Sequence, residues 1–228
     1  MIAVWRCNAP LSIYSPRCQA EVILALDTSG EVMVLCVLPS APDEGDGTRS
    51  LILPARAGAA LVEAISSLVV SGAPSLDRLA VVRGPGSFTG LRAGMGTAAG
   101  IAFARRLPIH PLSSLAVAAH RAAGETRVLA AVNAGRGRCF FQAFAHDGES
   151  WKASGERGLD TIEAAAHSAG QFDCALIAEP ALLERLQAAG GTTAAVTRTS
   201  AEALAAAARR AVEVDPPLAY DELTGDYQ

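Results

Sequence analysis

Short apolar runs alternate along this chain with longer segments in which apolar residues recur at helical spacing. The runs at 21–27 (EVILALD) and 31–38 (EVMVLCVL) are separated by a Thr-Ser-Gly turn, which predicts a β-hairpin. A helix is expected over 54–71, then a strand over 79–83 (LAVVR) and a second helix over 91–106. The first half of the chain therefore has the pattern of an α/β unit that opens with a hairpin.

The second half of the chain repeats this order after Pro108 and Pro111, which interrupt the pattern. A helix is expected over 112–123, and the runs at 128–132 and 139–145 predict a second hairpin. The remaining predicted elements are helices over 161–169, 180–189 and 201–213 and a short strand over 175–178. A hairpin thus opens a strand and helix segment twice, which predicts an α/β protein of two similar halves with mixed sheets flanked by helices.

The breaks in the pattern indicate how the chain is divided. Residues 1–20 hold two prolines and two cysteines without periodicity, and we interpret them as a flexible leader. The prolines after residue 107 make the best boundary, so an N-terminal lobe is expected over 21–107 and a C-terminal lobe over 108–214. The tail at 215–228 is placed with the N-terminal lobe as one alternative.

Composition excludes several classes of protein. Half of the residues are hydrophobic and only 18% are charged, which excludes a mostly disordered chain. The net charge of −4 disfavours a large basic surface that would grip nucleic acid alone. Lys152 is the only lysine, so a P-loop NTPase is excluded and Schiff-base chemistry is not expected.

The sequence carries no signal for a membrane or for export. No apolar run reaches the ~18–20 residues that cross a bilayer, and Arg6, Asn8 and Pro10 break any signal-peptide core. The five cysteines are odd in number, widely spaced and form no CxxC pair: Cys7, Cys18, Cys36, Cys139 and Cys174. We therefore expect free thiols in a reducing cytosol and a cytoplasmic location.

The chain shows no catalytic or metal-binding pattern of its own. None of the four histidines lies three to five residues from another, so no helical histidine pair can hold a metal. No GxSxG pattern supports Ser/His/Asp catalysis. Arg105 and Arg106 are more simply the end of a helix, and Arg136 and Arg138 a solvated hairpin turn, than RNA contacts.

Two glycine-containing loops are candidates for binding phosphate. ALDTSG at 25–30 places an acid before hydroxyls and a glycine at a strand end, where Asp27 could hold a hydrated cation. GPGSFTGLR at 84–92 opens a helix, whose N-terminus attracts anions. The candidate phosphate or nucleotide residues are Asp27, Thr28, Ser29, Gly84, Gly86, Ser87 and Thr89. The alternatives are an ordinary hairpin turn bonded to Asp27 and a capped strand-to-helix turn.

Glycines inside the second helix point to close packing. Gly94, Gly96 and Gly100 each cost roughly 1 kcal/mol relative to alanine, a loss that a closely packed neighbouring backbone offsets. The helix over 54–71 has a thin polar stripe for a surface helix. We favour a protein interface formed by both helices over burial inside one domain. The residues predicted at this interface are Arg56, Leu61, Ile65, Leu68, Leu91, Gly94, Met95, Ala98 and Ile101.

Three segments together resemble one known family: ALDTS, the helix ending in SG, and LAVVRGPGSFTGLRAGMGTAAGIA. They are similar to the TsaB (YeaZ) family of bacterial tRNA threonylcarbamoyladenosine biosynthesis proteins, from about residue 22 to about residue 144. The resemblance implies the fold of the actin, Hsp70 and sugar-kinase (ASKHA) superfamily, with two RNase H-like lobes. It also implies a non-catalytic subunit, because the family resembles the catalytic subunit TsaD without its HxxxH metal site.

The resemblance further implies partners. The complex would transfer a threonylcarbamoyl group to N6 of adenosine 37 in tRNAs that read ANN codons, with this chain as a scaffold. The helices over 54–71 and 91–106 would pack against TsaD, or against a second copy when the chain is alone. TsaE would join the pair, tRNA would be reached only through the complex, and no membrane is involved. No cofactor is intrinsic, and ATP or ADP with Mg²⁺ would belong to the complex.

Two other functions are weighed against this one. A stand-alone ASKHA phosphotransferase that uses ATP is favoured by Asp27 in its turn, but the second lobe offers no matching acid and Gly-rich phosphate loop. A metallopeptidase is disfavoured by the histidine spacing. The chain also departs from the family pattern at Arg56, in a stretch where a histidine often stands, and at Asn133, where an aspartate often stands.

Overall fold

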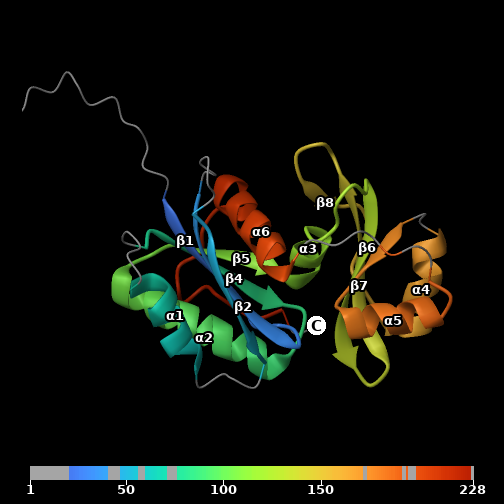
Figure 1. Cartoon of the computed structure of the whole chain (residues 1–228), viewed down its shortest axis with the longest axis horizontal. Helices are drawn as coiled ribbons and strands as arrows, with labels where there is room; N and C mark the ends of the chain where they lie inside the picture. Colours follow the sequence, from blue (N-terminus) through green and yellow to red (C-terminus); the bar gives the residue numbers. More distant parts are fainter. Residues whose placement is uncertain are drawn as a thin grey trace, which may run out of the picture.

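The computed structural model describes most of the chain, and Figure 1 shows two lobes side by side. The described residues are 21–40, 47–55, 60–70, 76–171, 174–191, 194 and 199–226. The predicted leader at 1–20 and the predicted interface residue Arg56 lie outside them. Each lobe is built on a mixed β-sheet flanked by helices, which confirms the predicted α/β class.

The sheet of the first lobe has the strand order β3-β2-β1-β4-β5. The strands are β1 (Val22–Asp27), β2 (Val32–Pro39), β3 (Arg49–Pro54), β4 (Arg78–Gly84) and β5 (Ile109–Ser113). The first three pair in an antiparallel manner, and β4 and β5 continue the sheet in parallel on the other side of β1. This confirms the predicted opening hairpin, with the parallel strands that a crossover helix allows.

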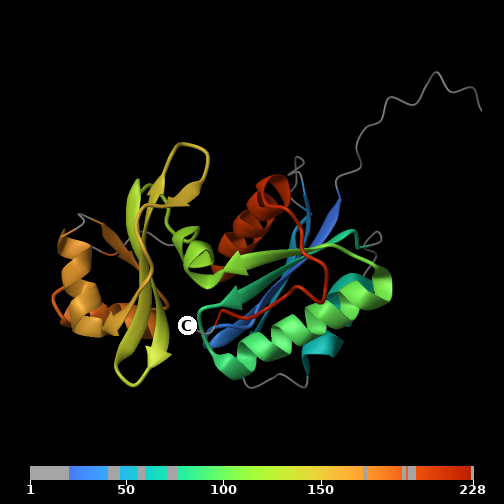
Figure 2. The same cartoon turned by 180° about the vertical axis from the view of Figure 1, so that it is seen from behind.

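Helices cover both faces of this first sheet. The helices α1 (Leu61–Val70) and α2 (Phe88–Arg105) lie on one face, and α6 (Ser200–Val214) lies on the other, as Figure 2 shows from behind. Residues on both sides of β1 and β2 are therefore buried. This explains why the two strands are continuous apolar runs rather than alternating ones.

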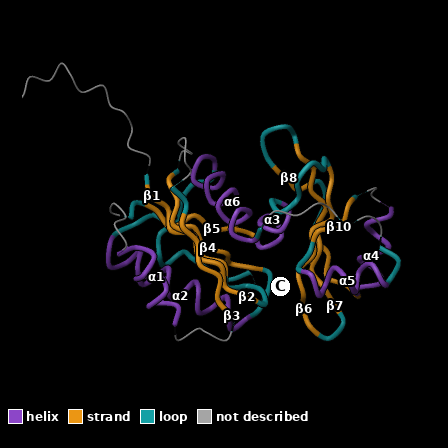
Figure 3. The backbone as a smooth tube through the Cα atoms, viewed as in Figure 1, coloured by secondary structure: helices purple, strands orange, loops and turns teal. Residues whose placement is uncertain are grey.

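The second lobe has a smaller sheet, with the order β10-β6-β7-β8 and with β9 also paired to β7. Its strands are β6 (Arg127–Gly135), β7 (Arg138–His146), β8 (Trp151–Ala153), β9 (Gly158–Thr161) and β10 (Ala175–Ile177). The tube in Figure 3 shows these strands set apart from the first sheet. The predicted second hairpin is confirmed as β6 and β7, which pair antiparallel.

The second sheet is also covered on both faces. The helices α4 (Ile162–Gln171) and α5 (Pro180–Ala188) pack on one face, and α3 (Ser114–Ala119) packs on the other. Neighbouring residues of β6 alternate between the two cores: Leu129 packs toward α4 and α5, and Val128 packs toward α3. The short helix α3 therefore lies between the two lobes.

The structure corrects two of the predicted helices. The first begins at Leu61 instead of residue 54, because Arg49–Pro54 forms the edge strand β3, where a terminal proline is tolerated. The helix predicted over 112–123 is shortened to α3, because Ile109–Ser113 pairs with β4 as a strand. Both segments become strands because their backbones pair with a strand distant in sequence. The local pattern of apolar residues does not predict such pairing.

The boundary predicted after residue 107 also differs from the structure. Strand β5 belongs to the first sheet, and α6 packs on that sheet rather than on the second one. The tail returns to the first lobe too, where Leu218 pairs with Ile109 and the Asp226 amide donates to the Arg83 carbonyl. The second lobe is thus inserted between elements of the first.

Three of the five cysteines lie in the described part of the chain. Cys36, Cys139 and Cys174 are buried, and none of these three is in a disulfide bond. Burial raises the pKa of the Cys36 thiol to about 12, so it stays protonated. Within the described ranges, no helix has the length and apolar character to cross a bilayer.

One buried histidine makes the fold sensitive to acid. His110 in β5 is 1% exposed, and its Nε2 lies 3.4 Å from Nη1 of Arg78, which is paired with Glu21. A guanidinium only donates hydrogen bonds, so this contact needs an unprotonated Nε2. Burial, together with the charge of Arg78, lowers the pKa of His110 and keeps the ring neutral in the folded protein.

We expect the free energy of unfolding to fall as the pH drops below about 6.5, the ordinary pKa of histidine. The unfolded chain takes up this proton first, and the folded protein does so only at a lower pH. The slope from this group is at most about 1.4 kcal/mol per pH unit. Urea unfolding of the His110→Gln variant should show a shallower pH slope than the wild type. The exposed His167 provides the control His167→Gln, and equal slopes for all three proteins would contradict the assignment.

Candidate functional site

The two glycine-containing loops meet at the end of the first sheet. The turn after β1 lies against the start of α2: the Ser87 amide donates to the Ser29 carbonyl at 2.8 Å. The Thr28 hydroxyl donates to the Gly90 carbonyl, also at 2.8 Å. Gly84 and Gly86 lie in the loop between β4 and α2. The predicted phosphate residues are therefore brought together in space.

The polar groups of this junction are engaged within the protein. Asp27 accepts hydrogen bonds from the amide and the hydroxyl of Ser29, at 2.9 and 2.6 Å. Burial raises the pKa of the Asp27 carboxyl, and the bonds from Ser29 oppose this shift. Ser87 caps α2 by accepting from the Gly90 amide. The amides of Ser29, Ser87 and Gly90, which a phosphate would need, thus donate inside the chain, while Thr89 is exposed.

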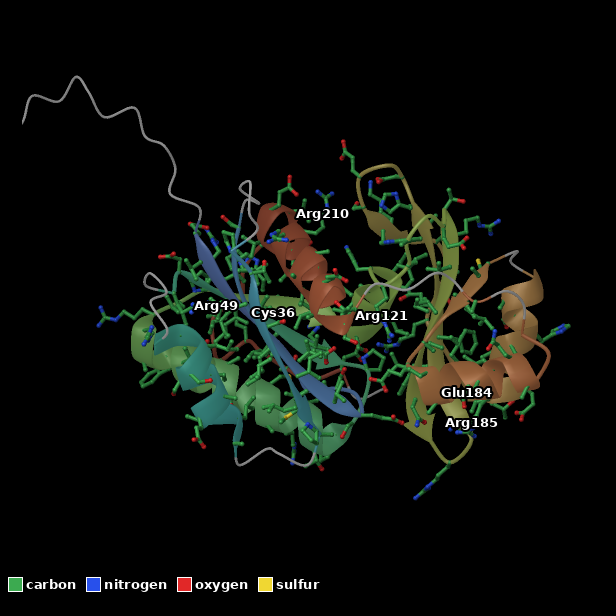
Figure 4. All side chains as sticks on the ribbon, in the orientation of Figure 1. Cys36, Arg49, Arg121, Glu184, Arg185 and Arg210 are labelled. Carbon is green, nitrogen blue, oxygen red and sulfur yellow. The ribbon has the colours of Figure 1, made fainter. Side chains whose placement is uncertain are left out.

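The cleft between the lobes is narrow. It is lined from the first lobe by Asp27 and Ser29 and from the second by Asn133 and Glu179, with Arg121 at the end of α3. Figure 4 shows Arg121 between the two lobes. The cleft has room for only about 50 Å³ of water-sized groups, whereas ligand pockets usually measure about 300–1,000 Å³. Among the described residues, no group of three or more His, Cys, Asp or Glu side chains is placed to hold a metal ion.

The glycines of α2 fall into two kinds. A Cβ atom at Gly90 would lie 2.0 Å from the Thr28 carbonyl oxygen, and one at Gly94 would lie 2.2 Å from the Thr28 hydroxyl. These two glycines are needed for packing within the lobe. A Cβ atom at Gly96 or Gly100 would meet nothing within 4 Å. Nothing in the described chain therefore explains Gly96 and Gly100, which lie exposed on the opposite side of the helix.

Gly96 and Gly100 form part of an apolar groove between α1 and α2. The groove offers about 440 Å³, and Val62 on its rim is 63% exposed. Its lining residues come from both helices and from the segment just before β4: Val62, Ile65, Ser66, Val69, Leu76, Gly96, Thr97, Gly100, Ile101, Ala104 and Arg105. We call this surface the α1/α2 groove. Exposed apolar surface of this kind makes the groove a candidate interaction site.

The structure corrects the composition of the predicted interface. Only Ile65 and Ile101 of the predicted set line the α1/α2 groove. Six others are core residues of the first lobe and face the sheet: Leu61, Leu68, Leu91, Gly94, Met95 and Ala98. Helical periodicity identified the two helices, but the apolar residues it selects are those that the lobe itself buries.

The predicted interface set leaves out four residues on another side of α2, although Gly96 and Gly100 were noted as glycines inside this helix. Phe88, Arg92, Gly96 and Gly100 recur every four residues, which places them along one stripe of the helix. Phe88 is 52% exposed, with the Arg92 guanidinium 4.3 Å from its ring centre, and Phe103 further along is 65% exposed. This four-residue repeat is the feature of the sequence from which the exposed stripe of α2 could have been predicted.

Comparison with known proteins identifies the family. The family model described as "TsaD: tRNA N6-adenosine threonylcarbamoyltransferase" matches residues 56–220. Curated relatives from Escherichia coli (strain K12) and Haemophilus influenzae, both described as "tRNA threonylcarbamoyladenosine biosynthesis protein TsaB", are 33% and 36% identical over 134 and 130 residues. This chain belongs to the TsaB/YeaZ family, within the TsaD-type domain family. The resemblance of the motifs is thereby confirmed.

Solved structures share the fold of this chain. YeaZ from Pseudomonas aeruginosa superposes with a TM-score of 0.74 at 26% identity, over 91% of this chain and all of that one. A structure described as an uncharacterized protein with similarity to peptidase YeaZ, also from that organism, has a TM-score of 0.72 at 22% identity, over 91% and 99% of the two chains. The sequence matches cover 55% of the E. coli protein and 53% of the H. influenzae protein, so they span about half of each relative.

The two kinds of glycine in this TsaB-family chain predict opposite effects of the same substitution. Gly100→Ala should raise the free energy of unfolding by up to about 1 kcal/mol, because alanine favours the helix and its methyl group meets open space. Gly94→Ala should lower it by about 1–3 kcal/mol, because its methyl group overlaps Thr28. Urea unfolding at low protein concentration measures both, and equal stability of the two variants would contradict the packing described here.

Proposed function

We propose that this chain is a non-catalytic scaffold subunit in tRNA threonylcarbamoyladenosine (t6A) biosynthesis. It would bind TsaD through the α1/α2 groove and support the transfer of a threonylcarbamoyl group to N6 of adenosine 37 in tRNAs that read ANN codons. TsaE would be recruited to the pair, and tRNA would be contacted through the complex. The observation that carries the proposal is the exposed apolar groove on a member of the TsaB/YeaZ family.

The geometry of the groove supports a helical protein partner. Gly96 and Gly100 leave the backbone of α2 uncovered within the groove, beside the exposed Val62 of α1. Another helix can therefore approach this backbone closely and pack against the apolar side chains of both helices. The same surface would pair with a second copy when TsaD is absent.

The interlobe cleft supports a role without catalysis by this chain. Its free space is a small fraction of a nucleotide pocket, and Asp27 is bonded to its own turn. Nucleotide with Mg²⁺ would then enter at the level of the complex. The alternative, a stand-alone ATP-dependent phosphotransferase, would need Asp27 and the amides around it to face a ligand.

The proposal is tested by mixing the purified chain with TsaD from the same organism and measuring mass by light scattering on a sizing column. A 1:1 species should form at the expense of a homodimer. Gly100→Leu should weaken pairing at least about tenfold, because its side chain fills the groove, while circular dichroism stays unchanged. Ala188→Leu, on the exposed side of α5, is the matched control. Equal pairing by a folded Gly100→Leu variant would overturn the groove as the interface.

A second measurement separates the scaffold from the phosphotransferase. The isolated chain should show no saturable Mg²⁺-dependent ATP turnover. Turnover that disappears in the Asp27→Ala variant would instead favour the phosphotransferase. Separate peaks of the two proteins at micromolar concentration, with or without nucleotide and TsaE, would contradict the scaffold.

A further inference from the structure

One carboxylate crosses the interlobe cleft and holds the opposite lobe. Glu179 follows β10 and stands at the start of α5 in the second lobe. Both of its carboxylate oxygens lie 3.4 Å from the Glu31 amide, in the turn between β1 and β2 of the first lobe. Glu179 occupies the N-cap position of α5, but its side chain makes no capping hydrogen bond there. The carboxylate contacts the first lobe instead of the start of its own helix.

The first lobe is shaped to receive this carboxylate. A Cβ atom at Gly30 would lie 2.1 Å from Oε1 of Glu179, so any other residue there would displace the carboxylate. Gly30 is therefore explained by close approach of the second lobe. The narrowness of the cleft fits this contact, since Gly30 and Glu179 both line it.

The surroundings of Glu179 hold its backbone in place. Arg121, at the end of α3, donates from Nη1 to the Ala178 carbonyl at 3.3 Å. Burial raises the pKa of the Glu179 carboxyl, as do the nearby charges of Glu31 and Asp27, while the Glu31 amide and Arg121 lower it. The carboxylate is thus half-buried at some cost, which its contact with the Glu31 amide opposes.

The turn that Glu179 holds is bonded on its other side to α2. The Thr28 hydroxyl donates to the Gly90 carbonyl, and the Ser29 carbonyl accepts from the Ser87 amide. Thr28 also fills the space left by Gly90 and Gly94. Residues 27–31 are therefore clamped between the second lobe and the first two turns of α2.

We propose that Glu179 is a latch that keeps the two lobes closed, and that the turn at residues 27–31 transmits its state to the start of α2. Release of the carboxylate loosens the turn. The turn contains Thr28, whose hydroxyl bonds the Gly90 carbonyl at the start of α2. A change in the position of the second lobe thereby alters the order of the helix that carries the exposed stripe. This goes beyond the proposed function and does not require it.

The lobes stay attached when this latch opens. Arg157 of the second lobe forms an ion pair with Asp226 of the tail, whose amide is bonded to the Arg83 carbonyl of the first lobe. Neither bond of this second tie uses Glu179 or a residue of the turn at 27–31. Loss of the Glu179 contact should therefore loosen the turn and α2 without separating the lobes.

Amide hydrogen exchange followed by NMR tests the latch in the full chain. Glu179→Ala should speed exchange of the Glu31 amide about tenfold, and should speed the Gly90 and Leu91 amides at the start of α2 as well. Gly30→Ala should have the same effect, because its methyl group displaces the flexible end of Glu179. The double variant should exchange no faster than either single variant, since both remove one contact.

Glu184→Ala is the matched control, because Glu184 lies exposed on the same helix α5 (Figure 4). Its exchange at Glu31 should equal that of the wild type. Unchanged exchange in Glu179→Ala, or additive effects of the two substitutions, would overturn the latch. Faster exchange at Glu31 without any change at Gly90 and Leu91 would overturn the transmission to α2.

Discussion

The contact between Thr28 and the first half of α2 fixes the arrangement of the first lobe. Thr28 donates to the Gly90 carbonyl, and its atoms occupy the space that side chains at positions 90 and 94 would need. The helix axis can approach the end of β1 this closely only because both positions are glycine. This approach sets which side of α2 meets the sheet. The same contact therefore determines which side of α2 is left exposed to solvent.

Two surfaces take their character from this contact. On the inner side, the hydrogen bonds that build the junction use Asp27 and the amides of Ser29, Ser87 and Gly90, so a site with the outline of a phosphate loop is closed by its own polar groups. On the outer side, Gly96 and Gly100 remain without neighbours and open a groove against α1. The polar groups of the phosphate-like loop are thus engaged inside the lobe, while an apolar groove is exposed on its outer side.

Local pattern was sufficient where both faces of an element are buried by neighbouring helices. The apolar runs of β1, β2, β6 and β7 were predicted as strands because such runs are short, continuous and separated by turns. The edge strands β3 and β5 were missed. Pro54 and Pro111 disguise them, and only pairing with β2 and β4 makes them strands. The place of α6 on the first sheet also depends on a long-range contact that periodicity does not encode.

By itself, the sequence determined the α/β class, the two hairpins and the motifs that connect the chain to the TsaB/YeaZ family. It also predicted an interface on the helices α1 and α2 and drew attention to the glycines inside α2. Tertiary packing alone fixes which side of α2 is buried and which is exposed, because Gly94 and Gly100 look alike in the sequence and differ in whether Thr28 lies beside them. Tertiary packing likewise brings Glu31 to Glu179, since residues 148 positions apart become neighbours only when the lobes close. Hydrophobic periodicity reports burial along one element, whereas a site is made by the approach of several elements.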